Sequence, residues 1–329
     1  MHEEDEASKP LSDAQLWCLI LRSWNAVHRL RQLELTESGI TVEQSSVLTA
    51  LRYCGGAATS DELEDITLRQ QHSISALTNR MIKSGLVIKE KSPKERKSRV
   101  AITEYGQQVL ENTRRDAVTP VFSCLEQSEK AEFAAYLHAL REKVRDLLGT
   151  AYRPPFMQAI AAENAEKVNF IPEGNFAKVS DYNLWIFLDG AGFAMSRLRQ
   201  LELSKFGLTV EQSIVMMILR HRGGSITANK VGELTFRQHN SISALVNRMI
   251  KAGLIAREKK PGEKSSTISL TREGHDLFNR LTYVSLEMVF STLKPNERLD
   301  FIRYLNTVHD KARELLGFSR LGPALEKVG

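Results

Sequence analysis

The sequence predicts a mainly α-helical protein of the α+β class in which one domain occurs twice. The stretch TLRQQHSISALTNRMIK at 67–83 returns as TFRQHNSISALVNRMIK at 235–251, and residues 41–91 match 209–259 at 28 of 51 positions without a gap. A repeat of this length indicates a duplicated domain and not a solenoid. A chain of 329 residues holds two domains of roughly 150 residues each. We therefore expect a first domain at 1–149, a linker at 150–180 and a second domain at 181–329.

Apolar residues at helical spacing and the usual end signals define the elements of the first copy. Ser12 or Asp13 can cap the first helix, and Thr59 with Glu62 fits a capping box. Glycines follow three of the helices, as expected at helix ends. The elements predicted in order are helices at 12–35, 42–52, 59–66 and from about Gln70 to Gly85, strands at 86–90 and 99–102, and helices at 103–125 and 129–148.

The polar, basic run KSPKERKS between the two predicted strands reads as the turn of a hairpin. The second copy repeats the whole order from Tyr182 to Gly317. Between the copies, the linker contains Pro154-Pro155 and a short predicted helix at 156–168. We expect this linker to be a tether that also packs. Each copy is thus a helix-turn-helix followed by a hairpin wing.

The helix before each wing carries short polar side chains on one face and apolar ones, Ile74, Leu77, Met81 and Ile82, on the other. Gln and Asn can pair with adenine, Ser can bond either base partner, and Ala can contact a thymine methyl. The side chains predicted to contact DNA from these two helices are Gln70, Gln71, His72, Ser73, Ser75, Ala76, Asn79 and Arg80, and Gln238, His239, Asn240, Ser241, Ser243, Ala244, Asn247 and Arg248.

The net charge of +5 is concentrated at the first wing, where eight Lys and Arg between Arg80 and Arg99 face only Glu90 and Glu95. Clustered positive charge is what a phosphate-contacting surface requires. The wing residues predicted to contact DNA are Lys94, Arg96, Lys97 and Arg99, with Lys260 and Lys264 in the second copy. The plainer alternative for the wings is that they are solvated hairpins. For His72 and His239 the alternative is a surface histidine without base contacts.

The chain resembles the MarR family of bacterial winged-helix transcription regulators, once per copy. The resemblance is carried by GITVEQSSVL at 39–48 and GLTVEQSIVM at 207–216, by NRMIKSGLV and NRMIKAGLI, and by the passages at 89–106 and 257–274. The family's acidic residue followed by arginine is present as Glu95-Arg96. The second copy departs from it with Glu263-Lys264, so its wing is expected to bind less strongly.

The resemblance implies a protein that binds a double-stranded DNA operator, most simply as a repressor, and whose long terminal helices form a dimer interface. Two copies in one chain would form this interface as an intramolecular pseudo-dimer. The resemblance also implies a pocket for a small aromatic effector. The residues proposed to line it are Trp17, Trp24, His28, Tyr53, Trp185, Phe193 and His221. Plain core packing is the alternative for these side chains.

Other classes of function find little support in the sequence. No phosphate-binding glycine loop, HExxH or GxSxG is present, and no cofactor or metal ligand set is predicted. Cys18, Cys54 and Cys124 form no CxxC and are expected to be buried and inert. The polar N-terminus and the lack of a long apolar run predict a cytoplasmic protein. The main alternative is a winged-helix adaptor in which one or both heads bind protein instead of DNA.

Overall fold

The computed structural model describes residues 11–91, 98–114, 116–149, 176, 179–221, 225–236, 239–259 and 265–318. The first copy consists of α1 (Asp13–Glu37), α2 (Val42–Tyr53), β1 (Ala57–Thr59), α3 (Ser60–Thr67), α4 (Gln71–Lys83), β2 (Val87–Glu90), β3 (Arg99–Ile102), α5 (Glu104–Asn112), α6 (Thr119–Phe122) and α7 (Gln127–Leu148). The second consists of α9 (Asp181–Ser204), α10 (Val210–His221), β4 (Ser225–Thr227), α11 (Ala228–Thr235), α12 (His239–Lys251), β5 (Ile255–Glu258), β6 (Thr267–Leu270), α13 (Arg272–Asn279), α14 (Val284–Phe290) and α15 (Pro295–Leu315). The two copies therefore have the same described element order, which confirms the mainly helical tandem fold.

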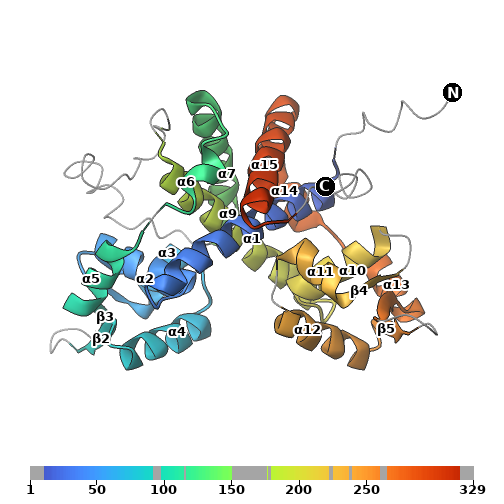
Figure 1. Ribbon diagram of the computed structural model, residues 1–329, viewed down its shortest axis with the longest axis horizontal. Helices are drawn as coiled ribbons and strands as arrows, with labels where there is room; N and C mark the ends of the chain where they lie inside the picture. The colour runs from blue at the N-terminus through green and yellow to red at the C-terminus, as the bar shows by residue number, and fades with distance from the viewer. Residues whose placement is uncertain are drawn as a thin grey trace. The chain divides into compact units, whose positions relative to one another are not determined.

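The chain forms two compact units whose boundaries differ from those of the sequence repeat (Figure 1). Unit 2 comprises Val27–Arg197, and unit 1 combines Met1–Ala26 with Leu198–Gly329. Unit 2 thus holds the winged head of the first copy and most of α9, whereas unit 1 holds the head of the second copy and the beginning of α1. The domain limits at 149 and 181 remain predictions from the repeat.

Each head contains a three-stranded antiparallel sheet with the strand that follows the wing in the middle. The order is β1-β3-β2 in unit 2, where Ala57 pairs with Ala101 and Val87 with Ile102. The order in unit 1 is β4-β6-β5. The first strand of each sheet was not predicted, because three residues give too short a pattern. The capping box at Thr59 is confirmed, with the Thr59 backbone N–H donating to Glu62 Oε2 over 2.7 Å.

The prediction of one helix over 103–125 is wrong, since α5 ends at Asn112 and α6 begins at Thr119. Pro120 cannot donate a backbone hydrogen bond and is tolerated only in the first turn of a helix. Gly106 fixes the start of α5, because a Cβ there would lie 2.1 Å from the Leu86 carbonyl oxygen.

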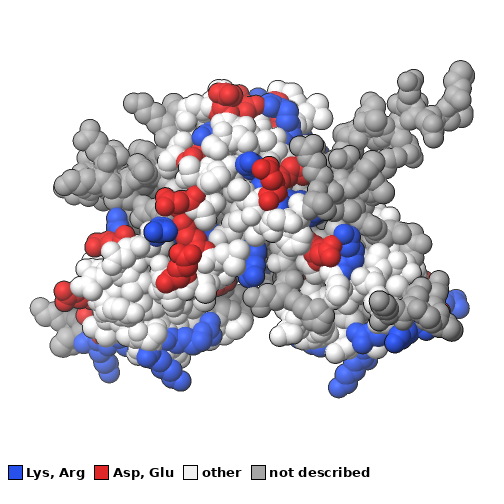
Figure 2. Space-filling model, viewed as in Figure 1, with Lys and Arg blue, Asp and Glu red and all other residues white. Residues whose placement is uncertain are grey.

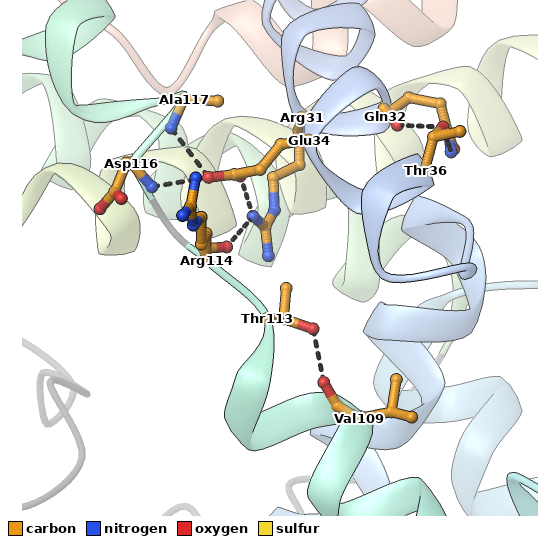
Figure 3. Close-up of polar contacts among 9 residues, drawn as sticks. All are labelled: Arg31, Gln32, Glu34, Thr36, Val109, Thr113, Arg114, Asp116 and Ala117. Atoms are coloured by element: carbon orange, nitrogen blue, oxygen red, sulfur yellow. Dashed lines mark hydrogen bonds and ion pairs between the residues drawn. The ribbon is translucent and has the colours of Figure 1, made fainter.

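A buried ion pair on α1 holds the segment between α5 and α6 (Figure 3). Arg31 donates to Glu34 and to the carbonyl oxygen of Arg114. Glu34 Oε1 in turn accepts the backbone N–H groups of Asp116 at 2.7 Å and Ala117 at 3.0 Å. One backbone carbonyl and two backbone N–H groups at the helix break are thereby satisfied, as buried polar groups require.

Unit 1 contains the equivalent ion pair on α9, whose glutamate accepts side-chain hydroxyls instead of backbone N–H groups. Arg199 Nη1 donates to Glu202 over 2.5 Å and to the Thr282 carbonyl oxygen over 2.6 Å. Glu202 accepts hydrogen bonds from the Thr282 and Ser285 hydroxyls. Burial acts to raise the pKa of Glu202, but the hydrogen bonds from Ser285 and Thr282 and the charge of Arg199 outweigh it and leave this pKa below its usual value.

The linker is described only at its end. Val179 is buried, and Gln127 Nε2 donates to its carbonyl oxygen over 3.2 Å. Lys130 pairs with Asp181 over 2.7 Å. These contacts tie Val179 and the first residue of α9 to the start of α7 within unit 2. The helix predicted at 156–168 lies outside the described residues.

We expect Glu202→Gln to lower the free energy of unfolding at pH 7 by about 3 kcal/mol, because it leaves Arg199 buried without its counter-charge. A carboxyl with a depressed pKa stabilises the fold above its unfolded-state pKa and loses this effect as pH falls through its folded-state pKa. The difference in unfolding free energy between variant and wild type should therefore shrink as the pH falls below the usual pKa range of glutamate. Urea unfolding at several pH values measures it.

Glu233→Gln is the matched control, since Glu233 also pairs with a cation three residues away but is exposed. Its effect should stay below about 1 kcal/mol. Equal effects of the two substitutions would contradict a structural role for the buried pair.

Candidate nucleic-acid interface

The polar face predicted for α4 is exposed in unit 2. Gln70, Gln71, His72, Ser75, Ala76, Asn79 and Arg80 are exposed, and Ser73 is half-buried. Ile74, Leu77 and Met81 are buried as predicted. Ile82 is only half-buried, and Thr78 takes the fourth buried position, donating its hydroxyl to the Ile74 carbonyl oxygen over 2.9 Å. A threonine whose hydroxyl is satisfied by its own helix can be buried at little cost.

The corresponding face of α12 is exposed in unit 1, at Asn240, Ser241, Ala244, Asn247 and Arg248, while Ser243 is half-buried. His239 begins α12, and Gln238 lies outside the described residues. Asn247 Oδ1 accepts a hydrogen bond from Arg257 on β5 over 3.2 Å. The equivalent position in the first copy is Lys89. Arg257 was not among the predicted residues, although the sequence shows it as a basic residue in the stretch that follows this helix.

Positive charge gathers along the edge of each unit that carries its exposed helix (Figure 2). The exposed cations on α4 and β2 and just after them are Arg80, Lys83, Lys89 and Lys91. Those on α12 and β5 and just after them are Arg248, Lys251, Arg257 and Lys259. Each group faces a single exposed acid on the strand, Glu90 or Glu258. Each unit thus presents a polar helix face beside a basic edge.

Most of the predicted wing contacts, Lys94, Arg96, Lys97, Lys260 and Lys264, lie outside the described residues. Arg99 is described and has a structural partner, because its Nη2 donates to the Ala57 carbonyl oxygen over 2.7 Å. This bond crosses from β3 to the edge strand β1. Arg99 therefore holds the sheet together at the base of the wing, a role that its place in a basic run did not reveal.

Unit 2 also contains a cavity of about 180 Å³ between the head and the long helices. It is lined by residues of α1, α2, α3, α7 and α9 together with Leu68, Arg69 and Phe176. Of the aromatic residues predicted to form a pocket, Tyr53, Trp185 and Phe193 line it. Trp17 is instead fully buried, and His28 packs edge-on against Trp185 at 6.1 Å without lining the cavity.

The cavity also has several charged residues that the sequence analysis did not select. Arg69, Arg141 and Arg145 line it together with Glu142 and Asp189. The guanidinium of Arg69 lies over the Phe193 ring at 4.3 Å. Burial lowers the pKa of Arg69 and of Arg141. The mixture of aromatic walls and desolvated cations suits an organic molecule more than a bare ion.

The three cysteines differ in how far they are buried. Cys18 is buried, and burial raises the pKa of its thiol to about 12. Cys54 is half-buried, and burial raises its thiol pKa to about 11. The expectation of burial is wrong for Cys124, which is exposed. A raised pKa keeps the first two thiols protonated and poorly nucleophilic.

We expect iodoacetamide at pH 8 to alkylate Cys124 in the folded protein while Cys18 stays unmodified, because alkylation needs both access and the thiolate. Mass spectrometry of peptides after a timed pulse measures the three sites separately. Unfolding in urea before the pulse is the control and should expose all three. Faster alkylation of Cys18 than of Cys124 in the folded protein would contradict the burial of Cys18.

The described residues contain no group of three or more potential metal ligands, and none of their helices is long and apolar enough to cross a membrane. The repeated helix-turn-helix, sheet and exposed helix define a tandem winged-helix protein. Residues 38–98 and 206–264, one segment in each copy, match the model of the MarR family. Both copies of the winged-helix domain therefore match the MarR family over these residues.

Three solved structures illustrate the comparison. A MepR-like protein complexed with pseudoligands is 22% identical, with 36% of this chain and 85% of that chain covered and a TM-score of 0.30. A mutant MarR from E. coli complexed with operator DNA is 20% identical, with coverage of 34% and 82% and a TM-score of 0.31. The transcriptional regulator SlyA is 18% identical, with coverage of 38% and 90% and a TM-score of 0.35. No curated protein matches the chain in sequence.

Proposed function

We propose that the protein is a sequence-specific, double-stranded DNA-binding repressor that reads two half-sites with α4 and α12. The observation that carries this proposal is the same exposed set of Ser, Ala, Asn and Arg on both helices, at Ser75, Ala76, Asn79 and Arg80 and again at Ser243, Ala244, Asn247 and Arg248. Ser243 alone of these is half-buried. Short polar side chains on an exposed helix reach base edges in a major groove, and the adjacent cations neutralise phosphates.

The two heads act together as a pseudo-dimer within one chain. The support for this is the duplication itself, because an isologous interface needs the same surface twice. Fusion of the copies replaces a concentration-dependent association by an intramolecular one. The half-sites then lie about one helical turn, ~34 Å, apart.

The half-sites are unequal. Gln71-His72 at the start of α4 stands where His239-Asn240 starts α12, and Lys89 stands where Arg257 contacts Asn247. Different side chains at the reading positions favour different bases. The operator is therefore an imperfect palindrome, and the cavity of unit 2 is the place where a small effector changes the affinity for it.

Selection of duplexes from a random-sequence pool by the full chain, at two salt concentrations, tests this proposal. One motif made of two spaced, unequal half-sites is the expected result. Two identical half-sites would contradict the inequality of the heads. Enrichment no better than a salt-sensitive background would favour the adaptor alternative.

Substitutions at Arg80 and Arg248 test the two heads separately. We expect Arg80→Ala and Arg248→Ala each to weaken operator binding and to reduce the slope of log K against log salt by about 1, as the loss of one phosphate contact predicts. Filter binding or fluorescence anisotropy over a salt series measures the slope. Arg303→Ala is the matched control, because it removes an exposed cation from α15, on the opposite side of unit 1 from α12 (Figure 1). An unchanged slope of log K against log salt for one of these variants would show that its head does not contact DNA.

A further inference from the structure

The first long helix of each copy contacts the last long helix of the other copy. Within unit 1, Asp13 on α1 pairs with Arg298 on α15 over 2.5 Å. Within unit 2, Asp181 on α9 pairs with Lys130 on α7 over 2.7 Å. The shift of 168 residues that relates the copies also relates these two ion pairs. They would therefore form equally well between two like copies and do not select a partner.

A second contact between the same helices differs in the two units. In unit 1, Arg22 on α1 meets His309 on α15, with 3.4 Å between Arg22 Nη2 and His309 Nε2. The counterparts in unit 2 are Gly190 on α9 and Arg141 on α7. A Cβ at Gly190 would lie 3.4 Å from Cδ and from Nε of Arg141, so the arginine side chain lies directly against the glycine. Each unit thus holds one arginine at this contact, and both arginines come from the first copy.

The partner of Arg22 in unit 1 adds no positive charge. His309 is buried, and burial lowers the pKa of its imidazole to about 4, so this side chain is neutral at pH 7. Its Nδ1 lies 3.2 Å from Asp310 Oδ1. An ionised carboxylate can only accept a hydrogen bond, so we assign the ring proton to Nδ1, which leaves Nε2 to accept from Arg22. One guanidinium is therefore accommodated beside a neutral acceptor.

The site of Arg141 in unit 2 already disfavours positive charge. Burial and the nearby charge of Arg145 lower the pKa of Arg141, and the charges of Glu142 and Asp189 do not offset them. A longer side chain at Gly190 would begin 3.4 Å from Arg141. A second cation at that position would add repulsion where the first is already partly desolvated. Glycine leaves the place beside Arg141 without charge.

The four residues give different results for different pairings. The first copy supplies Arg22 and Arg141, and the second supplies Gly190 and His309. When unlike copies pair, one arginine occupies each contact. If two first copies from different chains paired in the same geometry, Arg22 would meet Arg141 at both contacts, where two like charges repel. Two second copies would set Gly190 against His309 with no cation at either contact.

We propose that α1 and α7 of the first copy form a surface that fits the second copy and rejects another first copy, with Arg22 and Arg141 as the residues that reject it. The proposal deepens the pseudo-dimer part of the proposed function and rests on it for its meaning, because it keeps two unequal heads together. Specific pairing commonly combines contacts that attract the right partner with contacts that repel the wrong one. Here the ion pairs of Asp13 and Asp181 attract, and the two arginines discriminate.

Separation of the copies of the folded full chain tests this preference. A site for a specific protease is inserted between 150 and 178, and the chain is cleaved while folded. The fragments are then unfolded in urea, refolded together and weighed by native mass spectrometry, which distinguishes the three possible pairs. We expect like pairs to be at least about ten-fold rarer than in a statistical mixture. A statistical mixture, or fragments that do not pair, would overturn the proposal.

Two single substitutions isolate the discriminating residues. With Arg22→Gly, the contacts at this position contain the same residues in total whether like or unlike copies pair, so the position no longer selects a partner. The same holds for Arg141→His. Each variant should therefore lower the ratio of unlike to like pairs about ten-fold, whatever it does to stability. Arg303→Ala, which removes an exposed cation from α15, is the control and should keep the ratio. An unchanged ratio in both test variants would contradict the assignment.

Urea unfolding of the intact chain gives a second test that needs no fragments. Gly190→Arg should lower the urea midpoint more than Gly190→Met, which adds a side chain of similar length without charge. Adding Arg141→His to Gly190→Arg gives unit 2 the residue pair of unit 1 and should recover at least half of the loss. Equal midpoints for Gly190→Arg and Gly190→Met, or no recovery in the double variant, would contradict the proposal.

The outcomes are separate from those of the proposed function, because neither measurement contains DNA. A statistical mixture of fragments, together with a selected motif of two half-sites, would remove the pairing preference and keep the DNA-binding repressor. Strong pairing of unlike fragments without any DNA motif would do the reverse.

Discussion

The buried arginine and glutamate on the first long helix of each copy are the contact on which the rest of the domain depends. Arg31 with Glu34 holds the backbone of the segment that leaves the winged head. Arg199 with Glu202 holds the same segment of unit 1 through one backbone carbonyl and two side-chain hydroxyls. Removing one partner would leave a buried charge without compensation, which is far costlier than losing an exposed pair. The pair therefore fixes where the head ends and where the last helices begin.

The two copies share this ion pair but differ in part of their interior. The apolar side of the reading helix is the same in kind, with Ile74, Leu77 and Met81 matched by Ile242, Leu245 and Met249. The interior behind α2 has diverged, because Thr49 and Ala50 became Met217 and Ile218 or the reverse. In a homodimer such a change would alter both halves at once. Duplication within one chain allows the interiors of the two heads to differ.

The errors made from the sequence arise from hydrogen bonds that the sequence pattern does not show. A helix over 103–125 satisfies periodicity, but Pro120 interrupts it and backbone hydrogen bonds to Glu34 stabilise the break. Thr78 looks polar, yet its hydroxyl is satisfied within α4 and the residue is buried. Arg99 looks like part of a charged surface, yet it bonds a strand that is itself too short to predict. For the helix break and for Arg99 a long-range partner decided the outcome, whereas for Thr78 a bond within its own helix did.

The sequence by itself determined the duplication, the helix-turn-helix and wing order, and the exposed polar face of α4 and α12, because these follow from local periodicity and end signals within a few residues. Only the tertiary structure decided which aromatic residues meet around a cavity, that Arg141 lines it, and that Arg22 and Met217 contact His309 and Cys18 in unit 1. Those facts depend on residues more than a hundred positions apart along the chain being close in space. No local pattern encodes such proximity.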